Sequence, residues 1–211
     1  IVPMRNPIEL AAQVTELDQM SGGRFDFGVG VGWYREEFEA LGYDFTNRGK
    51  RMDEAMDLMK ALWSDGLVTF DGEFHSFSDA IMEPKPVQKP HPPIYIGGGS
   101  IHAMRRAARF ADGYQPTKET PAELAEQIKT LGDLLADEGR SLDGFAISPK
   151  VALSFEDGPE PTQGTAQEII DTIRRYEDVG ATEVCFDQKL ERIDIALALL
   201  DRLAGEIRPK L

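Results

Sequence analysis

The stretch from Arg24 to Trp33, RFDFGVGVGW, constrains the fold of this chain more than any other. Its hydrophobic residues alternate with small or polar ones, and this period of two predicts a strand over residues 25–31. Glycines close the strand, as they do where a ligand or a neighbouring segment approaches the backbone closely. Helical patterns precede and follow it, so the stretch indicates a parallel α/β protein. In such proteins the catalytic and binding residues lie at the carboxyl ends of the strands.

Composition narrows the classes of function. The chain has 211 residues, with 37 acidic against 23 basic side chains and a net charge of -14, which argues against a nucleic-acid partner. Cys185 is the single cysteine, so we expect neither a disulfide framework nor a metal site, and we expect this thiol to be buried. No apolar run reaches the roughly 18 residues of a membrane span, and the start, IVPMRNP, does not resemble a signal peptide. These features predict a cytoplasmic protein.

The rest of the sequence alternates helical and extended patterns. Val2–Met4 is expected to end a strand, and Asn6 with Pro7 is expected to begin a helix that Gly22 ends. Other helices are predicted at 36–41, 47–63, 101–111, 121–138, 165–179 and 191–207, and other strands near 93–97, 112–116, 147–155 and 182–187. The inward stripes are predicted to be Ile8, Ala11, Ala12, Val14, Leu17 and Met20 in the first helix, Met52, Ala55, Met56, Met59 and Leu62 in the third, and Ile193, Ala196, Leu197, Leu200, Leu203 and Ile207 in the last.

Residues 67–77 are predicted to form a hairpin with Asp71-Gly72 at its turn. We expect His75, on the second strand of this hairpin, to be structural or solvated, because no second metal ligand stands at a suitable spacing. The charged residues over 48–54 are expected to form surface ion pairs at helical spacing.

A second glycine-rich stretch follows the apolar strand Ile94–Ile96. Gly97, Gly98 and Gly99 free the backbone to curl, and Ser100 can cap the next helix. The free N–H groups and the positive end of the helix dipole then suit a phosphate. The same residues also suit a tight strand-to-helix turn without a ligand, and the residue types leave both interpretations open.

The pattern of predicted strands, helices and glycine motifs is compatible with two fold classes and several functions. A closed (β/α)8 barrel needs eight strands and a longer chain, so the predicted strands suit an open doubly wound sheet better. The run GVGVG also resembles the loops of dinucleotide and S-adenosylmethionine enzymes. However, Trp33 stands where the third glycine of G-x-G-x-x-G is required, and the methyltransferase pattern lacks an acidic partner strand.

Four segments of this chain resemble the bacterial luciferase-like monooxygenase family, and within it enzymes that use the deazaflavin coenzyme F420. The segments are RNPIELAAQVTELDQMSGGRFDFGVGVGWYREEFEALG (5–42), NRGKRMDEAMDLMKALW (47–63), VTFDGEFHSF (68–77), and PKPVQKPHPPIYIGGGS with AARFADGYQP (84–116). The resemblance implies a (β/α)8 TIM barrel, here incomplete, with strands 4–8 and the tail of strand 3 in one domain over residues 1–211. We therefore expect the isolated chain to fold poorly or to associate through open strand edges, and we expect a homodimer.

The resemblance also implies an oxidoreductase that acts on a small organic substrate. Hydride transfer with coenzyme F420 is favoured, an FMN-dependent monooxygenase is the alternative, and a non-catalytic flavin-binding protein is a further one. Gly97, Gly98, Gly99 and Ser100 would hold the cofactor phosphate. Gly30 and Gly32 would lie at the pocket end of the fourth strand, Trp33 would wall the pocket or lie in the core, and Glu36 and Glu37 would face the cofactor or complement a helix dipole. Trp33 occupies the position of an acidic catalytic residue in related sugar-phosphate dehydrogenases, so no catalytic residue is assigned.

Overall fold

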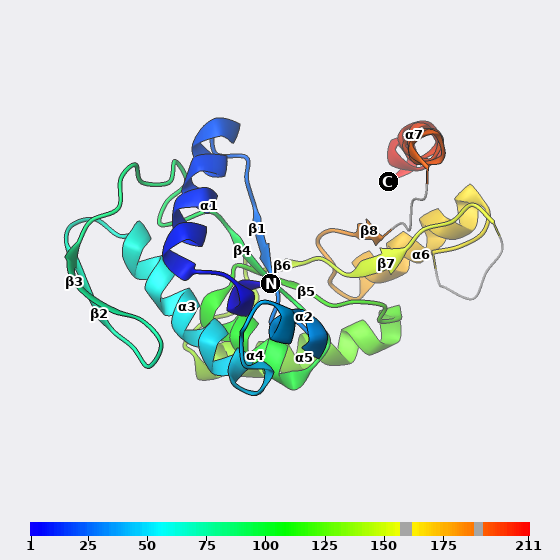
Figure 1. Cartoon of the computed structure of the whole chain (residues 1–211). Coiled ribbons are helices and arrows are strands. Elements are labelled where there is room, and N and C mark those ends of the chain that lie inside the picture. The colour runs from blue at the N-terminus through cyan, green and yellow to red at the C-terminus, as the bar shows by residue number, and fades with distance from the viewer. Residues whose placement is uncertain (157–161, 188–191) are drawn as a thin grey trace. The chain divides into compact units, whose positions relative to one another are not determined.

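The computed structural model describes residues 1–156, 162–187 and 192–211. Contacts divide the chain into two compact units. The first unit contains Ile1–Ile96 and Phe110–Asp112, and the second contains Gly97–Arg109 and Gly113–Leu211. Figure 1 labels the elements along the chain.

The elements alternate between helical and extended segments along both units. Up to residue 97 they are η1 (Val2–Met4), α1 (Pro7–Ser21), β1 (Phe27–Val29), α2 (Arg35–Ala40), η2 (Phe45–Asn47), α3 (Arg48–Trp63), β2 (Val68–Asp71), β3 (Ser76–Ala80) and β4 (Ile94–Gly97). The later ones are α4 (Ile101–Phe110), β5 (Gly113–Gln115), α5 (Pro121–Asp137), β6 (Ala146–Ile147), β7 (Lys150–Ala152), α6 (Ala166–Asp178), β8 (Cys185–Asp187), α7 (Ile193–Arg202), η3 (Leu203–Ile207) and η4 (Arg208–Lys210).

The paired strands joined by helical connections are parallel, as the sequence predicts. In the first unit β1 pairs with β4, and Phe27 lies opposite Ile94. In the second unit β5 pairs with β6 and β7 pairs with β8. Parallel neighbours need a crossover connection, so this pairing places the chain among α/β proteins.

The ends of α1 confirm the predicted start and stop signals. Asn6 Oδ1 accepts hydrogen bonds from the backbone N–H groups of Ile8, at 2.9 Å, and Glu9, at 3.4 Å. Pro7 occupies the first helical position, where its missing N–H costs nothing. Gly22 ends the helix with φ of 65° in the left-handed region.

The buried face of α1 differs from the predicted stripe. Ile8, Leu17 and Met20 are 43%, 47% and 84% exposed. The helix buries Ala11 and Val14, as predicted, and with them Leu10, Thr15 and Asp18. Asp18 accepts hydrogen bonds from the backbone N–H of Gln88, at 3.0 Å, and from its side-chain amide, at 2.8 Å. These hydrogen bonds compensate the burial of the Asp18 carboxylate on the inward face of the helix.

The first core forms where α1 packs against α3 (Figure 1). The predicted inward residues of α3 are all buried: Met52, Ala55, Met56, Met59 and Leu62. Trp63 is buried at the end of α3, and its indole N–H donates to the Ala11 carbonyl at 3.1 Å. Its ring meets Phe27 of β1 edge to face, with centroids 6.2 Å apart. The core therefore fixes β1, whose carboxyl end carries the first glycine cluster.

Three strand predictions need correction. Val2–Met4 forms a 3-10 turn rather than a strand end, because Arg5 N–H closes it onto the Val2 carbonyl. The strand predicted over 25–31 is paired only as Phe27–Val29, opposite the equally short partner segment of β4. The strand predicted over 147–155 is divided into β6 and β7 around Pro149, which has no N–H for a ladder hydrogen bond.

The hairpin is confirmed as the antiparallel pair β2 and β3. Asp71 pairs with Ser76, so the turn spans residues 72–75, and Gly72 N–H donates to the His75 carbonyl at 2.9 Å. The turn is therefore longer than a two-residue Asp-Gly turn, and His75 precedes the second strand rather than lying on it.

The second unit has its own hydrophobic cluster, centred on α6 and the segment after α7. Leu153, Ile169, Ile170, Ile173 and Ile207 are buried there, and Leu199 and Leu203 pack against them. The predicted stripe of the last helix is therefore wrong for Ile193, Leu197 and Leu200, which are 77%, 55% and 58% exposed. Cys185 is half-buried rather than buried. The predicted start of that helix, Glu191, lies outside the described residues.

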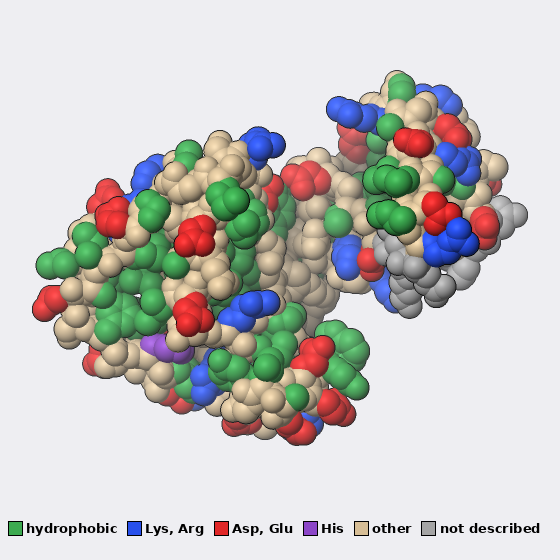
Figure 2. Space-filling model, turned by 45° about the horizontal axis from the view of Figure 1, so that its top comes forward, with side chains coloured by type: hydrophobic (Ala, Val, Ile, Leu, Met, Phe, Trp, Pro, Cys, Tyr) green, Lys and Arg blue, Asp and Glu red, His purple; other side chains and the backbone are tan. Residues whose placement is uncertain are grey.

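Surface side chains are mixed in character. On the face that Figure 2 shows, Lys and Arg side chains are scattered among acidic and hydrophobic ones and form no continuous basic patch. Within the described residues, no helix is long and apolar enough to cross a membrane.

Candidate functional site

The turn after β4 has the geometry that its glycines predict. Gly98 has φ of 117°, a conformation that favours glycine, and its N–H donates to the Gln115 carbonyl at 3.1 Å. Ser100 caps α4, because its Oγ accepts the Ala103 N–H at 3.2 Å and its carbonyl accepts the Met104 N–H at 3.0 Å. The predicted capping role of Ser100 is confirmed.

The turn after β4 presents backbone hydrogen-bond donors at the start of α4. The N–H groups in the first turn of an α-helix have no carbonyl partner within the helix, and the helix dipole places partial positive charge there. Gly97, Gly98 and Gly99 leave the backbone without side chains to shield these groups. The chemistry of this donor set therefore fits a phosphate ester.

A carboxylate that no sequence motif indicates lies against the same turn. Glu119 Oε1 is so close to the Gly99 backbone that a Cβ on Gly99 would collide with it. Gln127 Nε2 donates to this Oε1 at 3.1 Å, and Tyr114 OH donates to Gln127 Oε1 at 3.0 Å. Tyr176 OH donates to the Glu119 backbone carbonyl at 2.6 Å. Glu119 is thus held by Gln127 at its side chain and by Tyr176 at its main chain, and Tyr114 orients Gln127.

The surroundings of Glu119 are electrostatically unusual. Burial, with the negative charge of Glu119 as the second cause, raises the pKa of Tyr114 well above its usual value. Glu119 Oε2 is itself buried, and it has no hydrogen-bond partner among the described residues. Glu119 belongs to no recognisable motif, but it follows β5, and residues after barrel strands are where function concentrates.

The glycines after β1 have a packing role in the first unit. Gly32 has φ of 79°, and a Cβ there would come within 2.8 Å of both Ile1 Cγ2 and Phe38 Cε2. Gly30 is less restricted, since a Cβ would stay 3.8 Å from Ile1 Cδ1. Its carbonyl accepts the Val2 N–H at 3.3 Å. Position 32 therefore requires glycine because Ile1 and Phe38 of the same chain pack against its backbone. This requirement holds without any ligand.

The side chains that follow these glycines face solvent. Trp33 is 83% exposed, and its ring centroid lies 5.4 Å from that of Tyr34. This exposure contradicts the alternative that Trp33 is a core aromatic. Glu36 and Glu37 are exposed in the first turn of α2, where Glu37 lines a surface pocket of about 610 Å³ with Arg5 and Leu41.

The two groups of predicted cofactor residues belong to different units. Gly30, Gly32, Trp33 and Glu37 lie in the first, and Gly97–Ser100 lie in the second. The contacts of each group therefore lie within its own unit. Among the described residues, no cluster of three or more His, Cys, Asp or Glu side chains could hold a metal ion.

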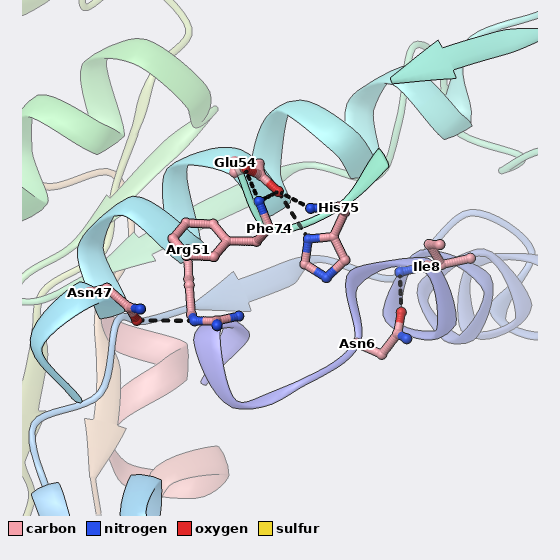
Figure 3. Close-up of polar contacts among 7 residues, drawn as sticks. All are labelled: Asn6, Ile8, Asn47, Arg51, Glu54, Phe74 and His75. Atoms are coloured by element: carbon pink, nitrogen blue, oxygen red, sulfur yellow. Dashed lines mark hydrogen bonds and ion pairs between the residues drawn. The ribbon is translucent and has the colours of Figure 1, made fainter. Parts of the chain in front are cut away.

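The polar cluster around α3 is structural (Figure 3). Glu54 accepts hydrogen bonds from the backbone N–H groups of Phe74, at 2.9 Å, and His75, at 2.8 Å. Arg51 lies over the Phe74 ring, 4.3 Å from its centroid, and its Nε donates to Asn47 Oδ1 at 3.0 Å. The structural role predicted for His75 is confirmed, whereas Glu54 ties α3 to the hairpin turn rather than forming a surface ion pair along its helix.

Hydrogen bonds set the ionisation of Glu54. Partial burial opposes its charged form, but hydrogen bonds from Phe74, from the His75 side chain and from neighbouring backbone N–H groups outweigh this effect. Together they hold the pKa of Glu54 below its usual value.

Comparison with known proteins identifies the family. The family model described as luciferase-like monooxygenase matches residues 1–184. The chain therefore belongs to the luciferase-like monooxygenase family, and the family predicted from the sequence is confirmed.

Individual relatives cover this chain to different extents. An uncharacterised protein of Mycobacterium tuberculosis is 34% identical over 203 residues, which are 96% of this chain and 66% of that protein. The FMNH2-dependent dimethylsulfone monooxygenase of Pseudomonas putida is 31% identical over 140 residues, 65% of this chain and 39% of that enzyme. This chain thus spans less than two thirds of the length of these relatives.

Solved structures support the barrel class. A monooxygenase from Streptomyces bottropensis superposes with a TM-score of 0.85 at 20% identity, over 99% of this chain and 75% of that one. An F420-dependent secondary alcohol dehydrogenase gives a TM-score of 0.80 at 19% identity, over 96% of this chain and 74% of that one. At these identities the likeness concerns the fold, which is that of the luciferase-like TIM barrels. The predicted barrel class is confirmed over the open doubly wound sheet.

Proposed function

We propose that this protein is an oxidoreductase that binds coenzyme F420 and transfers a hydride to or from a small organic substrate. The turn formed by Gly97, Gly98, Gly99 and Ser100 carries the proposal, because its geometry suits a phosphate ester and it follows a parallel strand. When bound, the deazaflavin supplies a carbon centre that gives or takes a hydride. The protein supplies binding, orientation and exclusion of water.

The residues have distinct proposed roles. The backbone N–H groups at the start of α4 would hold the cofactor phosphate, and Ser100 would keep that turn in place through its cap to Ala103. In the first unit, Gly30 and the exposed ring of Trp33 are proposed cofactor contacts at the end of β1, and Gly32 lets the backbone turn beside them against Ile1 and Phe38. Glu37 is a further proposed cofactor contact of this unit. No general acid or base is assigned.

An FMN-dependent monooxygenase is the second candidate. One observation favours it: a relative that is 31% identical to this chain is an FMNH2-dependent monooxygenase. In that case the same turn would hold the phosphate of FMN. The two candidates therefore share a phosphate site and differ in the cofactor ring and in the use of oxygen.

A pair of binding titrations separates the candidates. Quenching of deazaflavin fluorescence measures the affinity for coenzyme F420, and flavin fluorescence measures the affinity for FMN under the same conditions. We expect tighter binding of coenzyme F420. Oxygen uptake with reduced FMN, and none with reduced F420, would reverse the cofactor preference. Failure to bind either cofactor would contradict the proposed function and favour a non-catalytic protein.

We also propose that the protein acts as a homodimer. The exposed apolar side chains of α1, Leu17 and Met20, support an association surface on this helix. Light scattering of the purified protein should give twice the chain mass of 23.4 kDa. A monomer at micromolar concentration would contradict the dimer.

A further inference from the structure

We propose that Glu119 determines which phosphate ester the turn after β4 accepts, by favouring a singly charged diester over a doubly charged monoester. The inference rests on the proposed function, because it assumes that the turn holds the phosphate of a flavin or deazaflavin cofactor. It adds a role for a residue that lies outside the turn itself.

The position of the carboxylate carries the inference. Glu119 Oε1 lies against the backbone of Gly99, the central part of the proposed phosphate turn. All the groups involved belong to the second unit. A phosphate bound by the N–H groups of this turn would therefore lie close to a fixed negative charge.

The hydrogen bonds around Glu119 keep that charge in place. Gln127 Nε2 holds Oε1 at 3.1 Å, and the Tyr114 hydroxyl orients Gln127 at 3.0 Å. The Tyr176 hydroxyl holds the Glu119 main chain at 2.6 Å, and Tyr176 is fully buried. An anion arriving at the turn would not displace the carboxylate without breaking this network.

The hydrogen bond to the carboxylate comes from a neutral group. Gln127 donates to Glu119 Oε1, and Oε2 has no hydrogen-bond partner among the described residues. The carboxylate repels a second anion in proportion to the charge of that anion.

The two cofactors differ in that charge. The phosphate of coenzyme F420 is a diester and carries one negative charge. The phosphate of FMN is a monoester, which carries about -1.5 to -2 charges near pH 7 because its second pKa is about 6. Glu119 would therefore penalise FMN more than coenzyme F420, while the turn still attracts both through its N–H groups.

Glu119→Gln tests the role with little change of shape. The amide oxygen of Gln can still accept the Gln127 hydrogen bond, so the variant removes charge and keeps the contact. Glu126→Gln is the matched control, because Glu126 is an exposed acid on the neighbouring α5 and its substitution removes the same charge. Dissociation constants are measured for FMN, riboflavin and coenzyme F420 with the unaltered protein and both variants.

We expect Glu119→Gln to raise the affinity for FMN by about tenfold relative to coenzyme F420, the scale of a partly screened charge interaction. Riboflavin, which has no phosphate, should change by less than about twofold, and Glu126→Gln should change no ratio. An unchanged FMN-to-F420 ratio in Glu119→Gln, or an equal shift in Glu126→Gln, would overturn the inference.

The pH dependence gives a second measurement. As the pH falls from about 7.5 to about 5.5, FMN takes up its second phosphate proton. The gain in FMN affinity that Glu119→Gln produces should therefore be larger at about pH 7.5 than at about pH 5.5, while its effect on coenzyme F420 stays level. An equal gain in FMN affinity at both pH values would overturn the inference even if both cofactors bind. Binding of neither cofactor would instead overturn the proposed function, and the inference with it.

Discussion

His75 Nδ1 lies 3.0 Å from Glu54 Oε1, so a side chain of α3 holds the turn of the hairpin. The same carboxylate accepts the backbone N–H groups of Phe74 and His75, and the side chain of Glu54 is only 11% exposed. One partly buried carboxylate therefore accepts two backbone N–H groups of the turn and contacts the His75 imidazole.

Glu54→Gln should destabilise the protein by about 1–3 kcal/mol, because an amide replaces one acceptor oxygen with a donor that faces other donors. Urea unfolding measures the loss. Glu73→Gln is the control, since Glu73 forms an exposed ion pair with Lys50 at 3.4 Å, with side chains 62% and 71% exposed. Equal stability of Glu54→Gln and the unaltered protein would contradict a structural role for this carboxylate.

The lowered pKa of Glu54 predicts an acid-sensitive contribution to stability. A carboxyl group whose pKa falls on folding stabilises the fold fully above its unfolded pKa, about 4.3 for Glu. That contribution is lost as the pH falls through the lower pKa of the folded state. The difference in unfolding free energy between the unaltered protein and Glu54→Gln should therefore be constant from pH 6 to 8 and shrink below about pH 4. A difference that stays constant down to pH 3 would exclude this linkage.

Gly28, within β1, and Gly32, after it, form a matched pair of substitution sites. Gly32→Ala should lower the stability by more than about 1 kcal/mol, because φ of 79° strains alanine and the Cβ would meet Ile1 and Phe38 at 2.8 Å. Gly28→Ala should be neutral or slightly stabilising, since no atom lies within 4 Å of a Cβ there. Thermal unfolding of both variants measures the contrast. Equal effects would mean that packing at Gly32 does not require glycine.

Local signals predicted much of the fold. Asn6, Pro7 and Gly22 mark the ends of α1 because caps depend on hydrogen bonds between residues close in the chain. Thr120 likewise begins α5 through a capping box with Glu123 three positions later. These elements need no knowledge of the tertiary structure.

Distant contacts explain what the sequence could not predict. The face that α1 buries depends on Asp18 and Gln88, 70 positions apart, and no periodic pattern reports that pairing. In the candidate site, the strand-to-helix turn at Gly97–Ser100 is predictable because a glycine run before a helix is visible in the sequence. Glu119 was missed because it reaches Gly99 through the fold and belongs to no motif.

The most direct test of the phosphate site replaces Gly98 with Asp and, as the control, with Asn. Both variants share the strain of φ at 117°, so their difference reports the added negative charge alone. Fluorescence titration with coenzyme F420 should show at least about tenfold weaker binding to Gly98→Asp than to Gly98→Asn, because the carboxylate would lie at the proposed phosphate site. Equal affinities of the two variants for coenzyme F420 would contradict a phosphate site at this turn.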